Sequence, residues 1–164
     1  MKTFAVSLFC LVIINPQFPA VAPVSESSTQ EKHTAAPKYD PKRDPEKDIQ
    51  GAIAEAGRTG KRILLEVGGE WCSWCHIMDR YFQENPKLLD LREKGFVMVK
   101  INFSRENENK NLLSHYPPIP GYPHIFVLDM NGKLLHSQDT SELESGKSYD
   151  LEKFVSFLKK WARS

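Results

Sequence analysis

The chain has 164 residues, which is enough for one domain with short extensions and too few for two large domains. Its 22 Lys and Arg residues nearly balance its 21 Asp and Glu residues, so the formal net charge is +1. This balance argues against a protein that binds nucleic acid or an anionic membrane surface through charge. Three cysteines are too few for a small disulfide-held scaffold, so the positions of Cys10, Cys72 and Cys75 matter more than their number.

Residues 1–22 have the pattern of a secretory signal peptide. Lys2 precedes an apolar run over residues 4–14, which is too short to span a bilayer and long enough for a signal-peptide core. Small residues at 20–22 supply a cleavage pattern. We therefore predict export of the chain, and the alternative is an uncleaved N-terminal membrane anchor. Cleavage would remove Cys10 and leave the other two cysteines.

Residues 23–43 are predicted to form a flexible polar tether that leads to a folded domain over residues 44–164. The stretch 25–32 is polar, has no aromatic residue and shows no periodicity. Such a segment cannot bury enough apolar surface to offset the entropy that it would lose on ordering.

The first half of the domain predicts alternating helices and strands. Residues 44–60 begin with Asp-Pro, carry an apolar stripe and end in Gly, which is typical of a capped helix. The apolar runs 63–67 and 96–101 are typical of buried strands. Between these two strands, a helix should begin near Cys72 and end at Asn85-Pro86, where a short helical turn should begin.

The second half of the domain continues this alternation. Residues 105–116 predict a weak helix because they are charged and rich in Asn. A third strand over 124–128 is followed by Asn131-Gly132, a hairpin signal that leads into a strand over 133–136. A final amphipathic helix begins near Asp150. The order predicts an α/β fold with a mixed central sheet of about four strands and helices on both faces.

The chemistry is concentrated in Cys72-Ser73-Trp74-Cys75, which follows the first strand and opens a helix. A cysteine at a helix N-terminus faces unpaired backbone N–H groups and the positive end of the helix dipole. Both favour the thiolate, so we expect the pKa of Cys72 to lie below the free-thiol value of about 8.5. Cys75 lies on the same helical face and is placed to attack a mixed disulfide formed by Cys72.

The two cysteines also fit three other kinds of site. A purely structural disulfide is one, and half of a zinc site is another, but zinc needs four ligands and no second Cys pair or His cluster follows. With His76, the motif also reads C-x-x-C-H, which attaches c-type haem. Haem needs a further axial ligand that no position suggests. We therefore predict a redox dithiol with no metal and no cofactor, and keep the haem protein as an alternative.

Over roughly residues 44–162 the chain resembles the thioredoxin superfamily. The resemblance rests on Trp71 before the first cysteine and on Gly121-Tyr122-Pro123, which is similar to the Gly-Tyr-Pro of protein disulfide isomerases. Glu66 stands six residues before Cys72, where the family carries a buried acid, and Lys100 matches the lysine that faces this acid. The chain is most similar to exported single-domain thioredoxin-like proteins of bacteria, which implies the periplasm as its location.

The resemblance also implies roles for individual residues. Cys72 is the nucleophile, Cys75 resolves the mixed disulfide, and the two form the active-site disulfide. Glu66 relays a proton to or from Cys75, and Pro123 is a cis-proline that positions substrate against the disulfide. Substrate contact is assigned to Trp71, Trp74 and Tyr122, and tuning of the pair to Ser73, His76 and Lys100.

The predicted function is a thiol–disulfide oxidoreductase that acts on exported proteins, most simply as a reductase. Its partners would be disulfide-containing exported proteins and a membrane-bound electron donor or acceptor, and the protein would be a monomer that binds no nucleic acid. Ser73-Trp74 differs from the Gly-Pro of thioredoxins and the Gly-His of the isomerases, so the direction of the reaction stays open. A disulfide oxidase or isomerase and a redox-inactive binding module are the alternatives.

Overall fold

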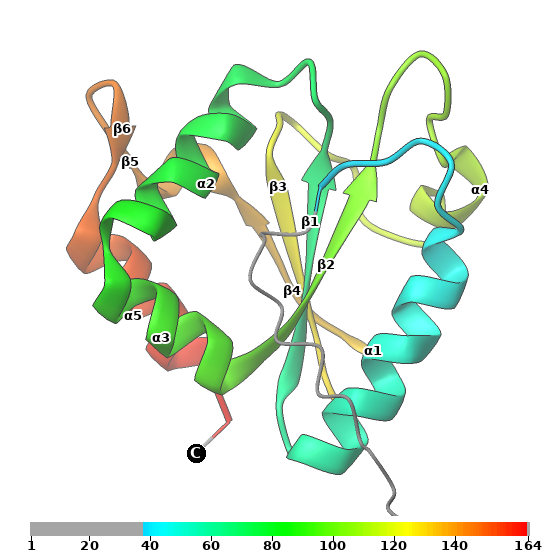
Figure 1. Ribbon diagram of the computed structural model, residues 1–164, viewed down its shortest axis with the longest axis horizontal. Coiled ribbons are helices and arrows are strands. Elements are labelled where there is room, and N and C mark those ends of the chain that lie inside the picture. The colour runs from blue at the N-terminus through cyan, green and yellow to red at the C-terminus, as the bar shows by residue number, and fades with distance from the viewer. Residues whose placement is uncertain (1–37, 164) are drawn as a thin grey trace, which may run out of the picture. The chain divides into compact units, whose positions relative to one another are not determined.

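The computed structural model describes residues 38–163, which form a mixed four-stranded sheet with the order β2-β1-β3-β4 (Figure 1). The central strand β1 (Arg62–Gly68) pairs parallel with β2 (Phe96–Asn102) and antiparallel with β3 (His124–Leu128). Strand β4 (Leu134–Asp139) completes the sheet by pairing antiparallel with β3. The predicted α/β class and sheet size are confirmed.

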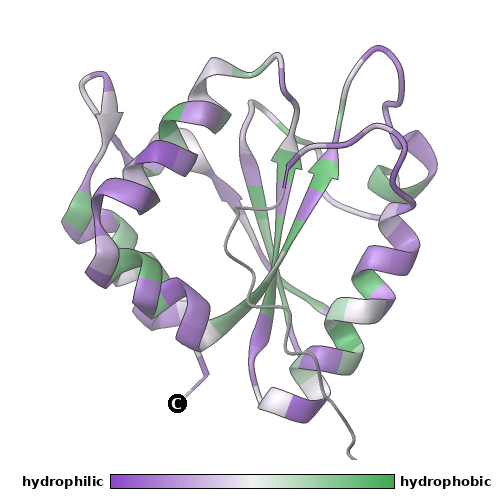
Figure 2. Cartoon of the chain, in the orientation of Figure 1, coloured by the Kyte–Doolittle hydropathy of each residue, from purple (hydrophilic) through white to green (hydrophobic). Residues whose placement is uncertain are grey.

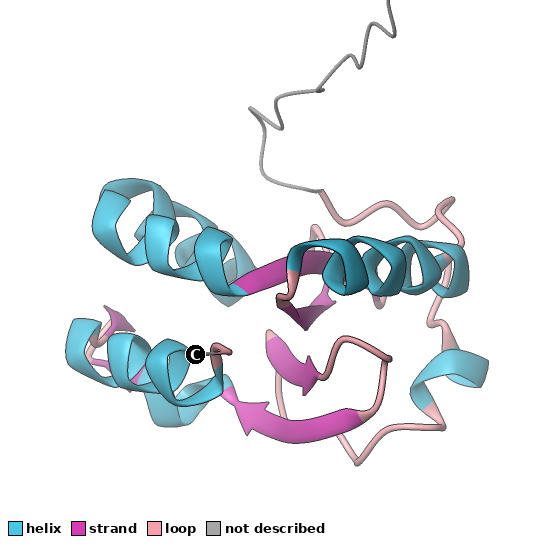
Figure 3. Ribbon diagram, turned by 90° about the horizontal axis from the view of Figure 1, so that it is seen from below, coloured by secondary structure: helices cyan, strands magenta, loops and turns pink. Residues whose placement is uncertain are grey.

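Helices cover both faces of this sheet, as Figures 1 and 3 show. On one face lie α1 (Pro45–Thr59) and the short α4 (Lys110–Leu113). On the other lie α2 (Ser73–Glu84), α3 (Pro86–Gly95) and α5 (Leu151–Trp161). Between β4 and α5 the chain forms the 3₁₀ helix η1 (Thr140–Leu143) and a small hairpin of β5 (Glu144–Ser145) and β6 (Ser148–Tyr149).

Successive residues of the strands point into two separate apolar cores, because side chains alternate across a sheet. Leu64 and Val127 pack with α2, α3 and α5, whereas Leu65 and Phe126 pack with α1. Figure 2 shows the apolar residues of the helices turned toward the strands. The alternation places Glu66 on the same face of β1 as Leu64, which is the face that α2 covers.

Local sequence signals explain where the helices begin and end. The carboxylate of Asp44 accepts hydrogen bonds from the backbone N–H groups of the first turn of α1, and Gly60 ends this helix at φ 73°. Pro86 opens α3 directly after α2, as predicted. The helix predicted over residues 105–116 is reduced to α4. The side chain of Asn102 donates to the carbonyl oxygen of Asn107, and that of Asn109 donates to the carbonyl oxygen of Asn102 at the end of β2, so these bonds hold the preceding residues as a loop.

The folded domain begins before the predicted boundary at residue 44. Tyr39 is only 4% exposed, so residues 38–43 belong to the fold and not to a tether. One buried aromatic ring thus anchors a segment that is otherwise polar. The predicted signal peptide and the remainder of the tether lie outside the described residues. Within residues 38–163, no helix combines the length and apolar character needed to cross a membrane.

Candidate active site

Cys72 and Cys75 form a disulfide at the N-terminus of α2, with their Cα atoms 5.3 Å apart. Both side chains are buried. Cys72 is the N-cap residue of the helix, and its Sγ accepts a hydrogen bond of 3.1 Å from the backbone N–H of Cys75. After reduction, this N–H and the helix dipole would stabilise negative charge on the sulfur of Cys72. The predicted strand–motif–helix arrangement is therefore present.

Glycine at the end of β1 allows the chain to pass close to the disulfide. A Cβ atom on Gly68 would lie 2.5 Å from the Sγ of Cys75 and 2.8 Å from the hydroxyl oxygen of Tyr39. Neither distance is compatible with non-bonded contact, so a side chain at this position would displace the sulfur, the phenol or β1 itself. The sulfur and the phenol therefore border the same small space.

A buried charged cluster adjoins this space. The Nζ atom of Lys100 lies 3.2 Å from Oε1 of Glu66 and 2.6 and 2.7 Å from the two carboxylate oxygens of Asp79. Glu66 is 1% exposed and Lys100 6% exposed, so the ion pair lies within the core. The lysine thus faces the acid, as the resemblance implied. Asp79 was missed, although it lies one helical turn after Cys75 and so shares its face of α2.

Tyr39 is a second residue beside the cysteines to which the sequence assigned no role at the site. Its hydroxyl donates a hydrogen bond of 2.5 Å to Oε1 of Glu66, and Nζ of Lys100 lies 4.4 Å from the centre of its ring. Its side chain packs against Cys72 and Cys75. Burial, followed by the negative charge of Glu66, raises the pKa of Tyr39 well above its usual value. The phenol therefore remains a hydrogen-bond donor at any working pH.

Aromatic side chains gather beside the disulfide, and Trp74 and Tyr122 pack against its cluster. Trp71 is 57% exposed, and its ring meets Tyr122 edge-to-face at 5.5 Å. Tyr122 stacks in turn on Phe103 at 4.9 Å, and Nε1 of Trp71 donates a hydrogen bond of 2.6 Å to the carbonyl oxygen of Phe103. Trp74 packs separately against Tyr149. We call Trp71, Phe103 and Tyr122 the aromatic wall, to which Phe103 is an addition that the sequence did not single out.

The Tyr122–Pro123 peptide bond is cis. The carbonyl oxygen of Pro123 accepts a hydrogen bond from the hydroxyl of Thr140, which is the first residue of η1. Tyr122 packs against the cluster that contains Cys72 and Cys75. The turn before β3 thus lies beside the disulfide, although it is distant in sequence.

The remaining predicted tuning residues lie on the solvent side of the motif. Ser73 is exposed, and so is His76, whose Nε2 lies 2.8 Å from the carbonyl oxygen of Glu70. The same nitrogen is 3.9 Å from the Glu70 carboxylate. Across the described residues, no three His, Cys, Asp or Glu side chains gather as a metal site.

His124 is buried on the opposite face of β3 from the charged cluster. Its Nε2 lies 2.8 Å from the hydroxyl of Ser137, whereas its Nδ1 is buried without a partner. Burial lowers the pKa of His124 below the ordinary 6.5, although Asp139 acts in the other direction. The imidazole is therefore neutral in the folded protein at neutral pH.

This neutral histidine should make the protein less stable in mild acid. Between pH 6.5 and 5.5 the unfolded chain binds more protons at this histidine than the folded protein does, so the free energy of unfolding should fall, by at most about 1 kcal/mol. Urea unfolding at the two pH values measures this change. His124→Gln should lose this part of the pH dependence, and the exposed control His115→Gln should retain it. An equal fall in wild type and His124→Gln would contradict the assignment.

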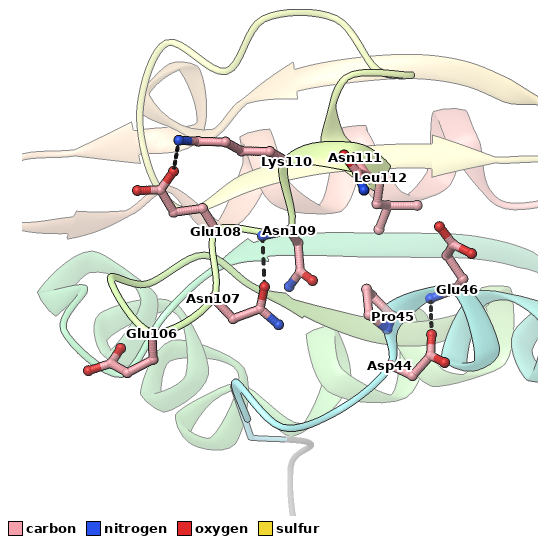
Figure 4. A pocket seen from close by; sticks show the side chains of 10 residues that line it. All are labelled: Asp44, Pro45, Glu46, Glu106, Asn107, Glu108, Asn109, Lys110, Asn111 and Leu112. Atoms are coloured by element: carbon pink, nitrogen blue, oxygen red, sulfur yellow. Dashed lines mark hydrogen bonds and ion pairs between the residues drawn. The ribbon is translucent and has the colours of Figure 1, made fainter.

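A separate hollow of about 520 Å³ lies between the start of α1 and the loop before α4 (Figure 4). Its acidic lining includes Glu46, Glu106 and Glu108, and Glu108 forms an ion pair of 2.6 Å with Lys110. The residues that line it include none of those placed at the disulfide. The redox chemistry therefore has to be sought at the disulfide and not in this hollow.

Comparison with known proteins agrees with this fold and motif. The family model for thioredoxin-like proteins matches residues 44–130, which is more than half of the chain. A solved structure of the disulphide isomerase from Xylella fastidiosa Temecula1 is 28% identical, has a TM-score of 0.65, and covers 77% of this chain and 98% of its own. The C-terminal domain of DsbD from Neisseria meningitidis, in the oxidised form, shares the fold at 20% identity with a TM-score of 0.53, covering 72% of this chain and 96% of its own.

Curated relatives include the thiol:disulfide interchange protein DsbD of Pseudomonas fluorescens, which is 26% identical over 71% of this chain. The alignment spans only 18% of that longer protein. DsbE of Pseudomonas aeruginosa is 36% identical over 34% of this chain and 27% of its own length.

The sheet order, the disulfide at the start of α2 and the family match together define the class of this protein. The chain belongs to the thioredoxin-like family. It is a thiol–disulfide oxidoreductase of the thioredoxin type, with Cys72 and Cys75 as its disulfide-forming pair.

Proposed function

We propose that the chain reduces disulfides in exported proteins. The observation that carries this direction is the sharing of one ammonium, that of Lys100, by the two carboxylates of Glu66 and Asp79. This cluster is joined to the disulfide through Tyr39. Arg92 of α3 adds a positive charge farther away, but among the described residues it forms no ion pair with either carboxylate. The charges in direct contact are thus net negative, which disfavours a nearby thiolate and makes the reduced pair less stable and a stronger reductant. A strong disulfide oxidant needs the opposite, a stabilised reduced form.

The two sulfurs divide the reaction into two exchanges. The Cys72 thiolate attacks one sulfur of the substrate disulfide, and the other substrate sulfur leaves as a thiolate that takes up a proton. Cys75 then gives its proton to Glu66 and attacks Sγ of Cys72, which releases the second substrate thiolate. Two electrons have moved to the substrate, and Cys72–Cys75 ends as the disulfide seen in the structure. A dithiol donor must reduce it before the next turnover.

Substrate binding is assigned to the aromatic wall, to Trp74 and to the turn at Pro123. Trp71 offers exposed aromatic surface, and exposed aromatic groups of this kind commonly mark contact sites. The cis bond at Pro123 turns the chain beside the disulfide, where an extended substrate segment can pair with its backbone. Ser73 and His76 are proposed to tune the pair from the exposed side.

Location and partners follow from the relatives and from the N-terminal sequence. We propose that residues 1–22 direct export to the bacterial periplasm and that a membrane-bound protein supplies the electrons. Relatives named as thiol:disulfide interchange proteins support such a chain of exchanges. The proposed form is a monomer that acts on disulfide-containing exported proteins and not on nucleic acid.

Disulfide isomerisation is the second candidate. It is favoured by Gly121-Tyr122-Pro123 and by the similarity to the Xylella fastidiosa structure that is described as a disulphide isomerase. An isomerase would restore activity to a scrambled substrate with mismatched disulfides, whereas a reductase would only open the disulfides of that substrate.

The reduction potential of the Cys72–Cys75 pair tests the proposed direction. We expect a value near the −270 mV or so of thioredoxin, because the charge of the cluster disfavours the thiolate form. Equilibration of the full chain with a glutathione or dithiothreitol buffer, followed by thiol alkylation, measures it. A value near −180 mV or about −120 mV, which are typical of isomerases and strong oxidases, would overturn the reductase proposal.

A further inference from the structure

We propose that Tyr39 is a positioning residue of the redox centre, and that its hydroxyl holds the Glu66 carboxylate in place to take the proton of Cys75. This inference rests on the proposed role of Glu66 as the proton acceptor. It makes the segment before α1 a working part of the active site, although this segment lies before the residues that the thioredoxin-like family model matches.

The contacts of Tyr39 place its hydroxyl between the acid and the sulfur. The hydroxyl donates to Oε1 of Glu66 at 2.5 Å, and the same oxygen lies 3.2 Å from Nζ of Lys100. The phenol and the Sγ of Cys75 border one space at Gly68, where an added Cβ would meet both. Tyr39 is thus the neutral donor to a carboxylate that also faces an ammonium, and its own side chain packs against the resolving cysteine.

The segment around Tyr39 is attached to the domain at several points. Its backbone N–H donates to the Glu70 carboxylate at 3.2 Å, and the carbonyl oxygen of Pro41 accepts a bond of 3.0 Å from the side chain of Asn107. Arg43 is paired with Asp48 of α1. In Figure 1 this segment crosses the ends of β1 and β2 before it enters α1. The ring therefore has a fixed position over the cysteines.

The Tyr39 hydroxyl holds the Glu66 carboxylate in the orientation from which it can accept a proton. Hydrogen bonding to a carboxylate favours its ionised form, which is the form that can accept a proton. Loss of the donor should leave the carboxylate less well ordered and less often in reach of the Cys75 proton, so resolution should slow. In such a variant Lys100 and Arg92 still stabilise the negative charge of Glu66, and Asp79 still opposes it. Loss of the Tyr39 hydroxyl should therefore slow resolution only in part.

The test separates the two exchanges by using oxidised glutathione as the disulfide substrate of the reduced full chain. Release of the first glutathione reports attack by Cys72, and release of the second reports resolution by Cys75. Tyr39→Phe keeps the ring and removes the hydroxyl, so we expect resolution to slow about tenfold while attack changes less than about twofold. Attack by Cys72 is the internal control, because a purely structural disturbance of the redox site would slow both releases.

Matched variants separate failure of this inference from failure of the proposed mechanism. Tyr116→Phe, whose ring packs on Phe126 away from the disulfide, should behave as wild type. Glu66→Gln should slow resolution, and adding Tyr39→Phe to it should have no further effect if the two act as one unit. Additive effects, a wild-type rate of resolution in Tyr39→Phe, or equal slowing of both releases in that variant would overturn the role of Tyr39 alone. Unchanged resolution in Glu66→Gln would overturn both the proton relay and the inference.

Discussion

Replacing Cys72 by alanine should lower disulfide reduction by at least about a thousandfold, to the rate of uncatalysed exchange. Cys72 lies at the N-cap of α2, where the backbone N–H of Cys75 and the helix dipole stabilise its thiolate. Cys75 lacks this N-cap position and is fully buried, so it should not substitute for Cys72 as the attacking sulfur. Turnover of a small disulfide substrate with dithiothreitol as the donor measures the loss.

Cys75→Ala provides the complementary result. Cys72 should still attack, and about one equivalent of mixed disulfide should accumulate because the resolving sulfur is absent. Mass spectrometry of the acid-quenched protein would detect this species. Lys94→Ala, at an exposed position of α3, serves as the control and should react as wild type. Full turnover by Cys72→Ala would refute the assignment of Cys72 as the nucleophile.

Gly68→Ala should destabilise the oxidised protein by about 1–3 kcal/mol, which is the usual range for overpacking a tight site. The added methyl group would lie 2.5 Å from Sγ of Cys75 and 2.8 Å from the hydroxyl of Tyr39, so one of them has to move. Because both groups belong to the redox site, resolution of the mixed disulfide should slow as well. Urea unfolding of the oxidised protein and the glutathione assay measure the two effects.

Gly57→Ala is the matched control for this substitution. Gly57 is exposed in α1, and nothing lies within 4 Å of an added Cβ. The change should therefore stabilise the protein by roughly 1 kcal/mol through helix propensity and leave the exchange rates unchanged. Equal stability changes in the two variants would show that the space at Gly68 is not restricted.

The parts of the fold that could be predicted are those determined by neighbours in the chain. The cap at Asp44, the interruption at Asn85-Pro86 and the turn at Asn131-Gly132 each depend on a few adjacent residues. The strand–cysteine–helix order of the motif is local in the same sense. Buried strands could also be predicted, because β1 is covered on both faces and is therefore apolar from Ile63 to Val67 except at Glu66.

The parts that could not be predicted depend on contacts between distant segments. Tyr39 lies 27 residues before Glu66 in the chain. Its neighbours in the sequence are polar, so no apolar pattern indicates that its ring is buried. Phe103 follows β2 and meets Tyr122 only after the sheet has formed. Asp79 differs from these two, since its helical spacing from Cys75 was visible, but nothing in the sequence indicated that it would share the Lys100 ammonium with Glu66.

The burial of Tyr39 determines where this protein can be shortened without opening its redox centre to water. A chain cut at residue 44, where the family match begins, would retain both cysteines, Glu66 and Lys100. It would nevertheless lose the ring that packs on the disulfide and the donor that binds the acid. Water would then reach Glu66 directly, and the carboxylate would lose the desolvated surroundings in which it meets Cys75. The minimal functional unit is therefore longer, at its N-terminal end, than the stretch that the family model matches.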